Sequence, residues 1–206
     1  SVSAFLLNRS SDLEITYKVG ATLGCGAPAL LMGDSIVMPY CFESYEVITR
    51  GPLRFEVCLH QSPRVVCGDT IRETRVIRLD KGSNFNRMEV WYDGLSKPVS
   101  LCSGVVVQKE DQESVVLGRN YVAYTDPTDQ PDVHHAPLYV AAIFPHGEVE
   151  IKRKDGHALG IIPNYQGGHF TYYFGSAWSK YDVRTAEEWN ARIGWFLRSI
   201  EHPLQV

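Results

Sequence analysis

Cysteine, clustered basic charge and long apolar runs are all scarce in this sequence of 206 residues. Five cysteines are too few for a disulfide scaffold, and their odd number favours reduced thiols. No run of lysine and arginine exceeds residues 152–154, and the net charge is −4, so nucleic acid and anionic membranes are poor partners. No apolar run approaches the roughly 20 residues that a bilayer span needs. We therefore expect a protein that binds neither nucleic acid nor membranes.

Signature motifs of several large enzyme classes are also missing from the sequence. It contains no G-x-S-x-G elbow, no P-loop, no H-E-x-x-H, no C-x-x-C and no strand-linked G-x-G-x-x-G. The sequence therefore disfavours nucleotide chemistry, serine hydrolysis with a nucleophile elbow, and zinc proteolysis. We predict no cofactor and no bound metal as the leading interpretation.

What the chain does contain is typical of strands and turns. It has 11 tyrosines, 8 phenylalanines and 4 tryptophans beside 17 glycines and 11 prolines. Hydrophobic and polar residues alternate with period two from about residue 13 to about residue 175, with turn residues about every 8–12 positions. Crossover helices, which a parallel sheet would need, are absent from this pattern. The sequence therefore predicts a mainly β protein, an antiparallel β-sandwich, in a single domain over residues 1–206.

One helix is predicted, at the end of the chain, over residues 185–201. Thr185 and Glu188 have the spacing of a capping box, in which each side chain accepts a hydrogen bond from a free backbone N–H at the helix start. An apolar stripe follows along one side of this helix, formed by Trp189, Ile193, Phe196 and Ile200. We expect the stripe to lie against the sheet.

A charged sheet face is the first candidate site. Alternation places two polar sets on one face of their strands: Arg54, Glu56 and His60 on one strand, and Arg87, Glu89 and Trp91 on another. Such a face is either an ordinary wet surface or the floor of a concave ligand site. In the second case Glu56 or Glu89 would act as a base, while Arg54 or Arg87 would hold the anionic group of an acidic sugar.

Two further groups of residues could contribute to chemistry. His134 and His135 follow Asp132 in a polar stretch, which is either a solvated loop or a source of a general acid or metal ligand. His169 begins an aromatic strand with Tyr172 and Tyr173, and Trp178 follows. These rings either stack on sugar rings or pack the sandwich core.

Several stretches together resemble a known bacterial family of unknown function. They are residues 12–30, 51–55, 77–80 with Gly82 and 84–86, 171–180, the terminal tryptophan helix and Pro203-Leu204. The resemblance implies a β-sandwich of the galactose-mutarotase type, from secreted or periplasmic proteins of polysaccharide-degrading bacteria. It covers the later part of the usual family domain, and the earlier segment has no counterpart here.

The resemblance implies a carbohydrate-active protein that handles an oligosaccharide or a uronic-acid-containing sugar on the concave face of its sheet. In mutarotase-like enzymes one carboxylate and one histidine transfer a proton at a sugar carbon, which nominates Glu56 or Glu89 with His134, His135 or His169. The alternatives are a non-catalytic module that binds glycan or a partner, and a metal-dependent hydrolase that uses Asp132 and the histidines. The missing segment also leads us to expect a homo-oligomer or association with that N-terminal segment, because a truncated sandwich exposes a sheet edge.

Overall fold

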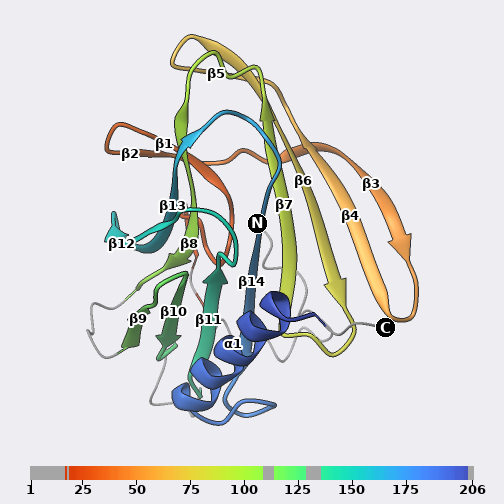
Figure 1. The fold of residues 1–206 in the computed structure, drawn as a ribbon, viewed down its shortest axis with the longest axis vertical. Helices are drawn as coiled ribbons and strands as arrows, with labels where there is room; N and C mark the ends of the chain where they lie inside the picture. The colour runs from red at the N-terminus through yellow and green to blue at the C-terminus, as the bar shows by residue number, and fades with distance from the viewer. Residues whose placement is uncertain (1–16, 18, 109–113, 129–135, 204–206) are drawn as a thin grey trace.

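Two antiparallel sheets and one helix make up the computed structural model, which describes residues 17, 19–108, 114–128 and 136–203 (Figure 1). The smaller sheet has the strand order β12 (Glu150–Lys154), β13 (His157–Tyr165), β8 (Val99–Val106), β1 (Ala29–Met32) and β2 (Ser35–Val37). The larger sheet has the order β3 (Phe42–Arg50), β4 (Arg54–Gln61), β6 (Asp69–Asp80), β7 (Phe85–Asp93), β14 (Phe170–Trp178), β11 (Leu138–Ile143), β10 (Tyr121–Asp126) and β9 (Val115–Leu117). The short β5 (Arg64–Val66) pairs with β6 but stands outside this strand order.

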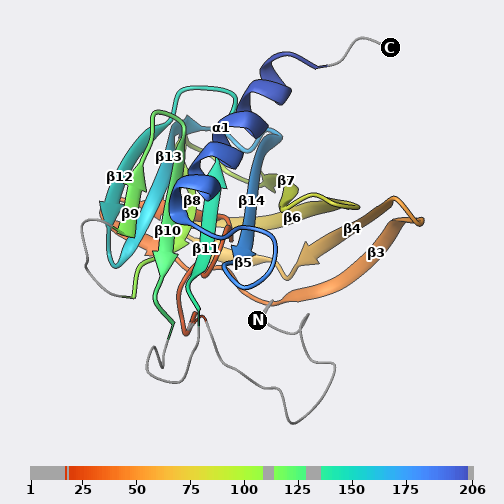
Figure 2. The same cartoon turned by 90° about the horizontal axis from the view of Figure 1, so that it is seen from below.

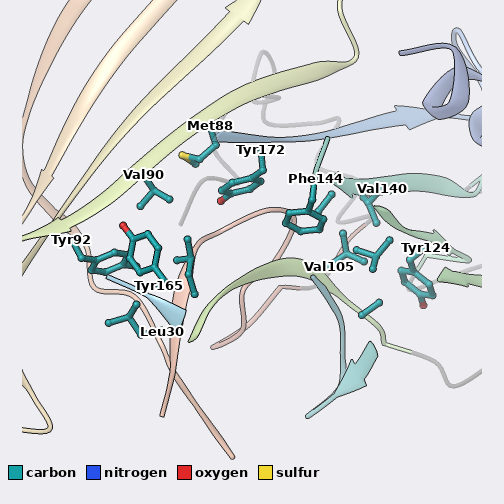
Figure 3. Packing of buried hydrophobic residues seen from close by; sticks show 14 of the residues in the cluster. Leu30, Met88, Val90, Tyr92, Val105, Tyr124, Val140, Phe144, Tyr165 and Tyr172 are labelled. Atoms are coloured by element: carbon teal, nitrogen blue, oxygen red, sulfur yellow. The ribbon is translucent and has the colours of Figure 1, made fainter. Parts of the chain in front are cut away.

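The two sheets pack face to face around one apolar core. Leu30 and Val105 of the smaller sheet meet Met88, Val90 and Tyr172 of the larger sheet, and all five are almost completely buried (Figure 3). Because apolar side chains from both layers interdigitate in this way, the fold is a β-sandwich. The predicted mainly β, antiparallel fold class is confirmed.

The helix α1 (Ala186–Glu201) forms a third layer on the opposite side of the larger sheet (Figures 1 and 2). Its Trp189, Ile193 and Leu197 pack against Phe85 and Ile143 of the sheet. Thr185 is the N-cap and its hydroxyl accepts from the Glu188 N–H, as predicted. The Glu188 carboxylate accepts from the N–H of Arg184, one residue before the cap. The predicted stripe differs at its end, where Leu197 is buried and Ile200 only half-buried.

The larger sheet has two faces, which we call inner, toward the smaller sheet, and outer, toward α1. On β4 the predicted division is confirmed in the register, because Glu56 and Arg78 share the outer face, while Phe55 and Leu79 share the inner one. On β6 the pattern is less simple. Glu73 and Arg75 lie on the inner face, buried and paired with each other, so charge alone did not mark the wet side of this strand.

Strand β3 was not predicted, and it forms an edge of the larger sheet at the side away from β9 (Figure 2). Four apolar side chains on the inner face of β3, β4 and β6 remain exposed: Phe42, Tyr45, Phe55 and Leu79. Tyr45 is 64% exposed and Phe55 38%. We call these four residues the open inner face, because the smaller sheet does not cover them.

Two further observations concern the cysteines and the helix. All five cysteines are free thiols. In the described part of the chain, no helix has both the length and the apolar character required to cross a bilayer.

Candidate functional site

Neighbouring strands β7 and β14 bring the predicted polar residues of the outer face together. The register of this antiparallel pair sets Glu89 opposite Thr171, and Arg87 opposite Tyr173. His169 directly precedes β14, and its side chain reaches Glu89. Alternation along each strand keeps these side chains on one face, so an 80-residue separation in sequence becomes direct contact.

The centre of the site is a carboxylate–imidazole pair. Oε1 of Glu89 lies 2.7 Å from Nδ1 of His169. The imidazole also stacks on the indole of Trp91, with ring centroids 4.2 Å apart and an angle of 13° between the planes. The His169 side chain is 61% exposed whereas that of Glu89 is 24% exposed. The imidazole is therefore open to solvent, while two contacts fix its position: the hydrogen bond to the shielded Glu89 carboxylate and the stacking on the Trp91 ring.

Arg87 fixes the other oxygen of the same carboxylate. Its Nη1 donates to Oε2 of Glu89 at 2.9 Å, and its Nη2 donates to the Thr171 hydroxyl at 3.1 Å. Partial burial raises the pKa of Glu89, but the hydrogen bonds from His169 and Arg87 and the charge of Arg87 outweigh it, so the net pKa lies below the usual value. Glu89 is therefore a carboxylate at neutral pH. We call Arg87, Glu89, Trp91, His169 and Thr171 the outer-face cluster.

This arrangement has a definite chemical capacity. When Nδ1–H of a neutral imidazole donates to Glu89, the other nitrogen, Nε2, is left as the proton acceptor. A carboxylate that orients imidazole and stabilises its charged form is the arrangement that general acid–base catalysis uses. The exposed ring nitrogen, an aromatic surface and an arginine are also the groups that bind polar, ring-shaped ligands.

Other predicted residues share the outer face without joining the cluster. Arg54 and Glu56 lie on β4, two strands from β7, which corresponds to about 10 Å at the usual strand spacing. Arg54 binds both carboxylate oxygens of Asp80. Tyr173 lies on the face of the cluster but packs edge-on against Phe196 of α1. The structure thus favours Glu89 over Glu56 as the partner of a histidine.

Two of the predicted sugar-binding aromatics lie on the wrong side of the sheet for this site. Tyr172 is fully buried in the inner core, and its hydroxyl donates to the backbone carbonyl of Gly26 at 2.6 Å. Trp178 has the same parity on β14 and its ring lies 5.4 Å from the Lys180 ammonium. Tyr172 is therefore a core residue, as the alternative interpretation of the aromatic strand held, and neither ring belongs to the outer-face cluster.

The second predicted group of histidines falls outside the described residues. Asp132, His134 and His135 all belong to residues 129–135, which the structure does not describe. In the part of the chain that is described, no three side chains of His, Cys, Asp or Glu converge as a metal site would require.

The structure adds two residues that the sequence did not single out. Thr171 accepts from Arg87, and Arg78 of β6 lies directly opposite Arg87 on the outer face. Alternation on residues 71–79 would have placed Arg78 on this face, but only the strand order could show that it faces Arg87.

These observations define the class of protein. It is a two-sheet antiparallel sandwich with a terminal helix and a polar cluster on its outer face. The chain belongs to the family described as Domain of unknown function (DUF4861), which matches residues 16–206. It is also similar to the uncharacterized protein P7 of Formosa agariphila, with 28% identity over 202 residues. That match covers 92% of this chain and 48% of the Formosa protein, so the chain spans about half the length of this relative.

Proposed function

We propose that this chain is a carbohydrate-active protein with a mutarotase-like architecture, and that it holds an oligosaccharide over the outer-face cluster. The observation that carries the proposal is the Glu89–His169 pair, stacked on Trp91 and tied to Arg87. Aromatic rings stack on the apolar faces of sugars, and charged or polar side chains bond the sugar hydroxyls. The family resemblance also implies one carboxylate and one histidine as the proton-transfer residues, which is the composition of this pair.

The chemistry assigned to the pair is proton transfer at a sugar carbon or its ring oxygen. Nε2 of His169 takes or gives the proton, and Glu89 stabilises the charged imidazole. Arg87 keeps Glu89 ionised throughout, because its Nη1 remains bonded to Oε2. An alternative within the same proposal is a glycan-binding module that uses the cluster only for recognition. We further propose a periplasmic or secreted location, which the resemblance implies and cell fractionation would test.

Calorimetry with a panel of neutral and acidic oligosaccharides tests the proposal. We expect binding that Glu89→Gln and His169→Asn each weaken, while the control Glu150→Gln, in an exposed ion pair on the other sheet, leaves it unchanged. Absence of binding at millimolar sugar by a folded sample would overturn the proposal.

Exchange spectroscopy by NMR on a bound sugar separates catalysis from recognition. A catalyst should interconvert sugar species at a rate that His169→Asn lowers at least about 100-fold, because a positioned acid or base contributes that much. A binding module should show no exchange above the uncatalysed rate, with or without the histidine.

The open inner face favours a second candidate function, association with a further polypeptide segment. Exposed large apolar groups gather there beside β3, whose free edge has no strand partner among the described residues. We propose that a segment equivalent to the part of the Formosa protein outside the match covers this face, because about half of that relative remains unmatched.

Light scattering and an apolar dye test this second candidate. The chain alone should be a monomer that binds the dye, Tyr45→Ser should reduce dye binding, and Tyr181→Ser, at a still more exposed tyrosine elsewhere, should not. Fusion to the unmatched part of the relative should suppress dye binding. A dimer that Tyr45→Ser dissociates would instead show self-association, and would refute this choice of occupant.

A further inference from the structure

A hollow of about 200 Å³ lies on the outer face beside the outer-face cluster, under the C-terminal half of α1. The sheet contributes Arg78, Asp80, Arg87 and Tyr173, and Tyr173 packs edge-on against Phe196 of the helix. Phe196 and Ile200 of α1 close the other side. The hollow thus has a charged floor and an apolar wall.

Two arginines face each other across the floor. Arg78 and Arg87 are direct partners in the β6–β7 register, a position where like charges destabilise a sheet. An anion bound between two guanidinium groups removes this repulsion, since each group offers donors in a planar fork.

The Arg78 guanidinium has unused donor capacity. Its Nε is buried and has no hydrogen-bond partner. The nearest carboxylate oxygen, on Asp80, lies 3.7 Å away, beyond hydrogen-bond distance. Asp80 is itself held by two hydrogen bonds from Arg54, which lower the pKa of its carboxyl; burial opposes the shift, and the charges of Arg54 and Arg78 add to it, so the net pKa lies below the usual value. Asp80 therefore remains charged and takes its hydrogen bonds from Arg54, which leaves the Arg78 guanidinium without a hydrogen-bonded carboxylate.

Arg87 connects the hollow to the outer-face cluster. Two of its donors are committed to Glu89 and Thr171, which fixes the plane of its guanidinium. The remaining N–H groups of the fork are available to a second acceptor. A ligand group bound there would sit two residues along β7 from Glu89, at the next side chain on the same face.

The apolar wall suits the ring of the same ligand. Tyr173 and Phe196 meet edge to face with centroids 5.0 Å apart, and both line the hollow together with Ile200. Sugar rings carry apolar C–H faces that pack on aromatic surfaces.

We propose that this hollow is a subsite for the anionic group of an acidic sugar, a carboxylate or a sulfate ester, bound between Arg78 and Arg87. The inference rests on the proposed function and names its substrate class. The carboxylate is planar and the sulfate ester tetrahedral, but both present anionic oxygens that guanidinium N–H groups can hold.

The test compares glucuronate, glucose and inorganic sulfate as probes, in calorimetry and as shifts of the melting temperature. We expect glucuronate to bind at least about tenfold more tightly than glucose, because charged hydrogen bonds to guanidinium are worth that factor. Arg78→Gln should remove the preference and leave glucose binding unchanged. Arg78→Lys should recover part of it, since it restores the charge without the fork. The matched control is Arg72→Gln, an exposed arginine on the outer face of the same strand.

The outcomes separate this inference from the function on which it rests. Sulfate protection with no glucuronate preference supports a sulfate ester as the anion, whereas the reverse supports a carboxylate. Equal binding of glucose and glucuronate, with no stabilisation by sulfate, overturns the subsite and leaves carbohydrate binding intact. Sulfate protection that Arg78→Gln abolishes, in a protein that binds no sugar, supports the anion site and sinks the carbohydrate function. An Arg78→Gln variant that melts like the unsubstituted chain and keeps the full preference also refutes the subsite.

Discussion

The imidazole Nε2 of His157 accepts a hydrogen bond from the backbone N–H of Leu23, 134 residues earlier in the chain, at 3.1 Å. Its Nδ1 bonds the Asp155 carbonyl at 2.6 Å. Since Nε2 must be unprotonated to accept, this contact needs neutral imidazole. Burial lowers the pKa of His157 below its ordinary value of 6.5, although the bond to Asp155 opposes the shift.

Stability should therefore fall with acid in a defined window. The folded protein binds fewer protons at His157 than the unfolded chain, so this contribution is complete above about pH 6.5 and is lost as the pH falls through the folded pKa. Urea unfolding between pH 7 and pH 5 should show a decline in unfolding free energy that His157→Asn flattens. The control is His202→Asn, at an exposed histidine. If the unfolding free energy of His157→Asn fell with pH in parallel with that of the unsubstituted chain, His157 would not be the source of the decline.

The helix cap gives a second prediction. Thr185→Ala removes the acceptor for the Glu188 N–H and should lower the unfolding free energy by about 1 kcal/mol. Ser199→Ala, whose hydroxyl donates to a carbonyl within the helix, should cost less. Equal losses in urea unfolding would show that the cap adds nothing beyond an ordinary polar contact.

Close backbone approach makes Gly104 irreplaceable. A Cβ at Gly104 would lie 2.0 Å from the backbone carbonyl oxygen of Ala158, where β8 pairs with β13 in the smaller sheet. Because neither backbone can withdraw without breaking the ladder, Gly104→Ala should cost about 3 kcal/mol or more. Gly168→Ala, where a Cβ meets nothing within 4 Å, is the matched control. Similar melting temperatures for the two variants would rule this explanation out.

Trp91 should affect sugar affinity through the imidazole as well as through direct stacking. Trp91→Ala removes the ring on which His169 stacks and should weaken sugar binding by about threefold to tenfold. Trp91→Phe should retain part of the affinity because it restores a smaller ring. Trp195→Ala, on the exposed side of α1, should bind sugar normally in the same titration. A loss as large in Trp195→Ala as in Trp91→Ala would remove Trp91 from the site.

Strand faces and the helix start could be predicted because each depends on neighbours in sequence. The two faces of β4 and the cap at Thr185 follow from residues at most a few positions apart. The edge strand β3 was missed because both its faces are largely exposed, so polar and apolar residues mix without a clear period. Burial of Glu73 and Arg75 was missed because an internal ion pair has the same sequence pattern as a wet face.

The site could be predicted only in part, because alternation reports which residues of one strand share a face but not which strands are neighbours. Arg87, Glu89 and Trp91 had to share a face, since they alternate on one strand. His169 could be assigned to Glu89 only through the pairing of β7 with β14, which is a property of the whole sheet order. For the adjacent Tyr172 and Tyr173, alternation required opposite faces but could not say which one entered the core.

The late position of β14 also constrains how the protein is made. Glu89 is synthesised some 80 residues before His169, and the helix that roofs the hollow follows later still. During translation the early strands must wait, with the centre of the larger sheet unfilled, until β14 inserts between β7 and β11. The proposed proton transfer would therefore be possible only after β14 has been synthesised, so a product terminated before β14 would carry Glu89 and Trp91 yet remain inert.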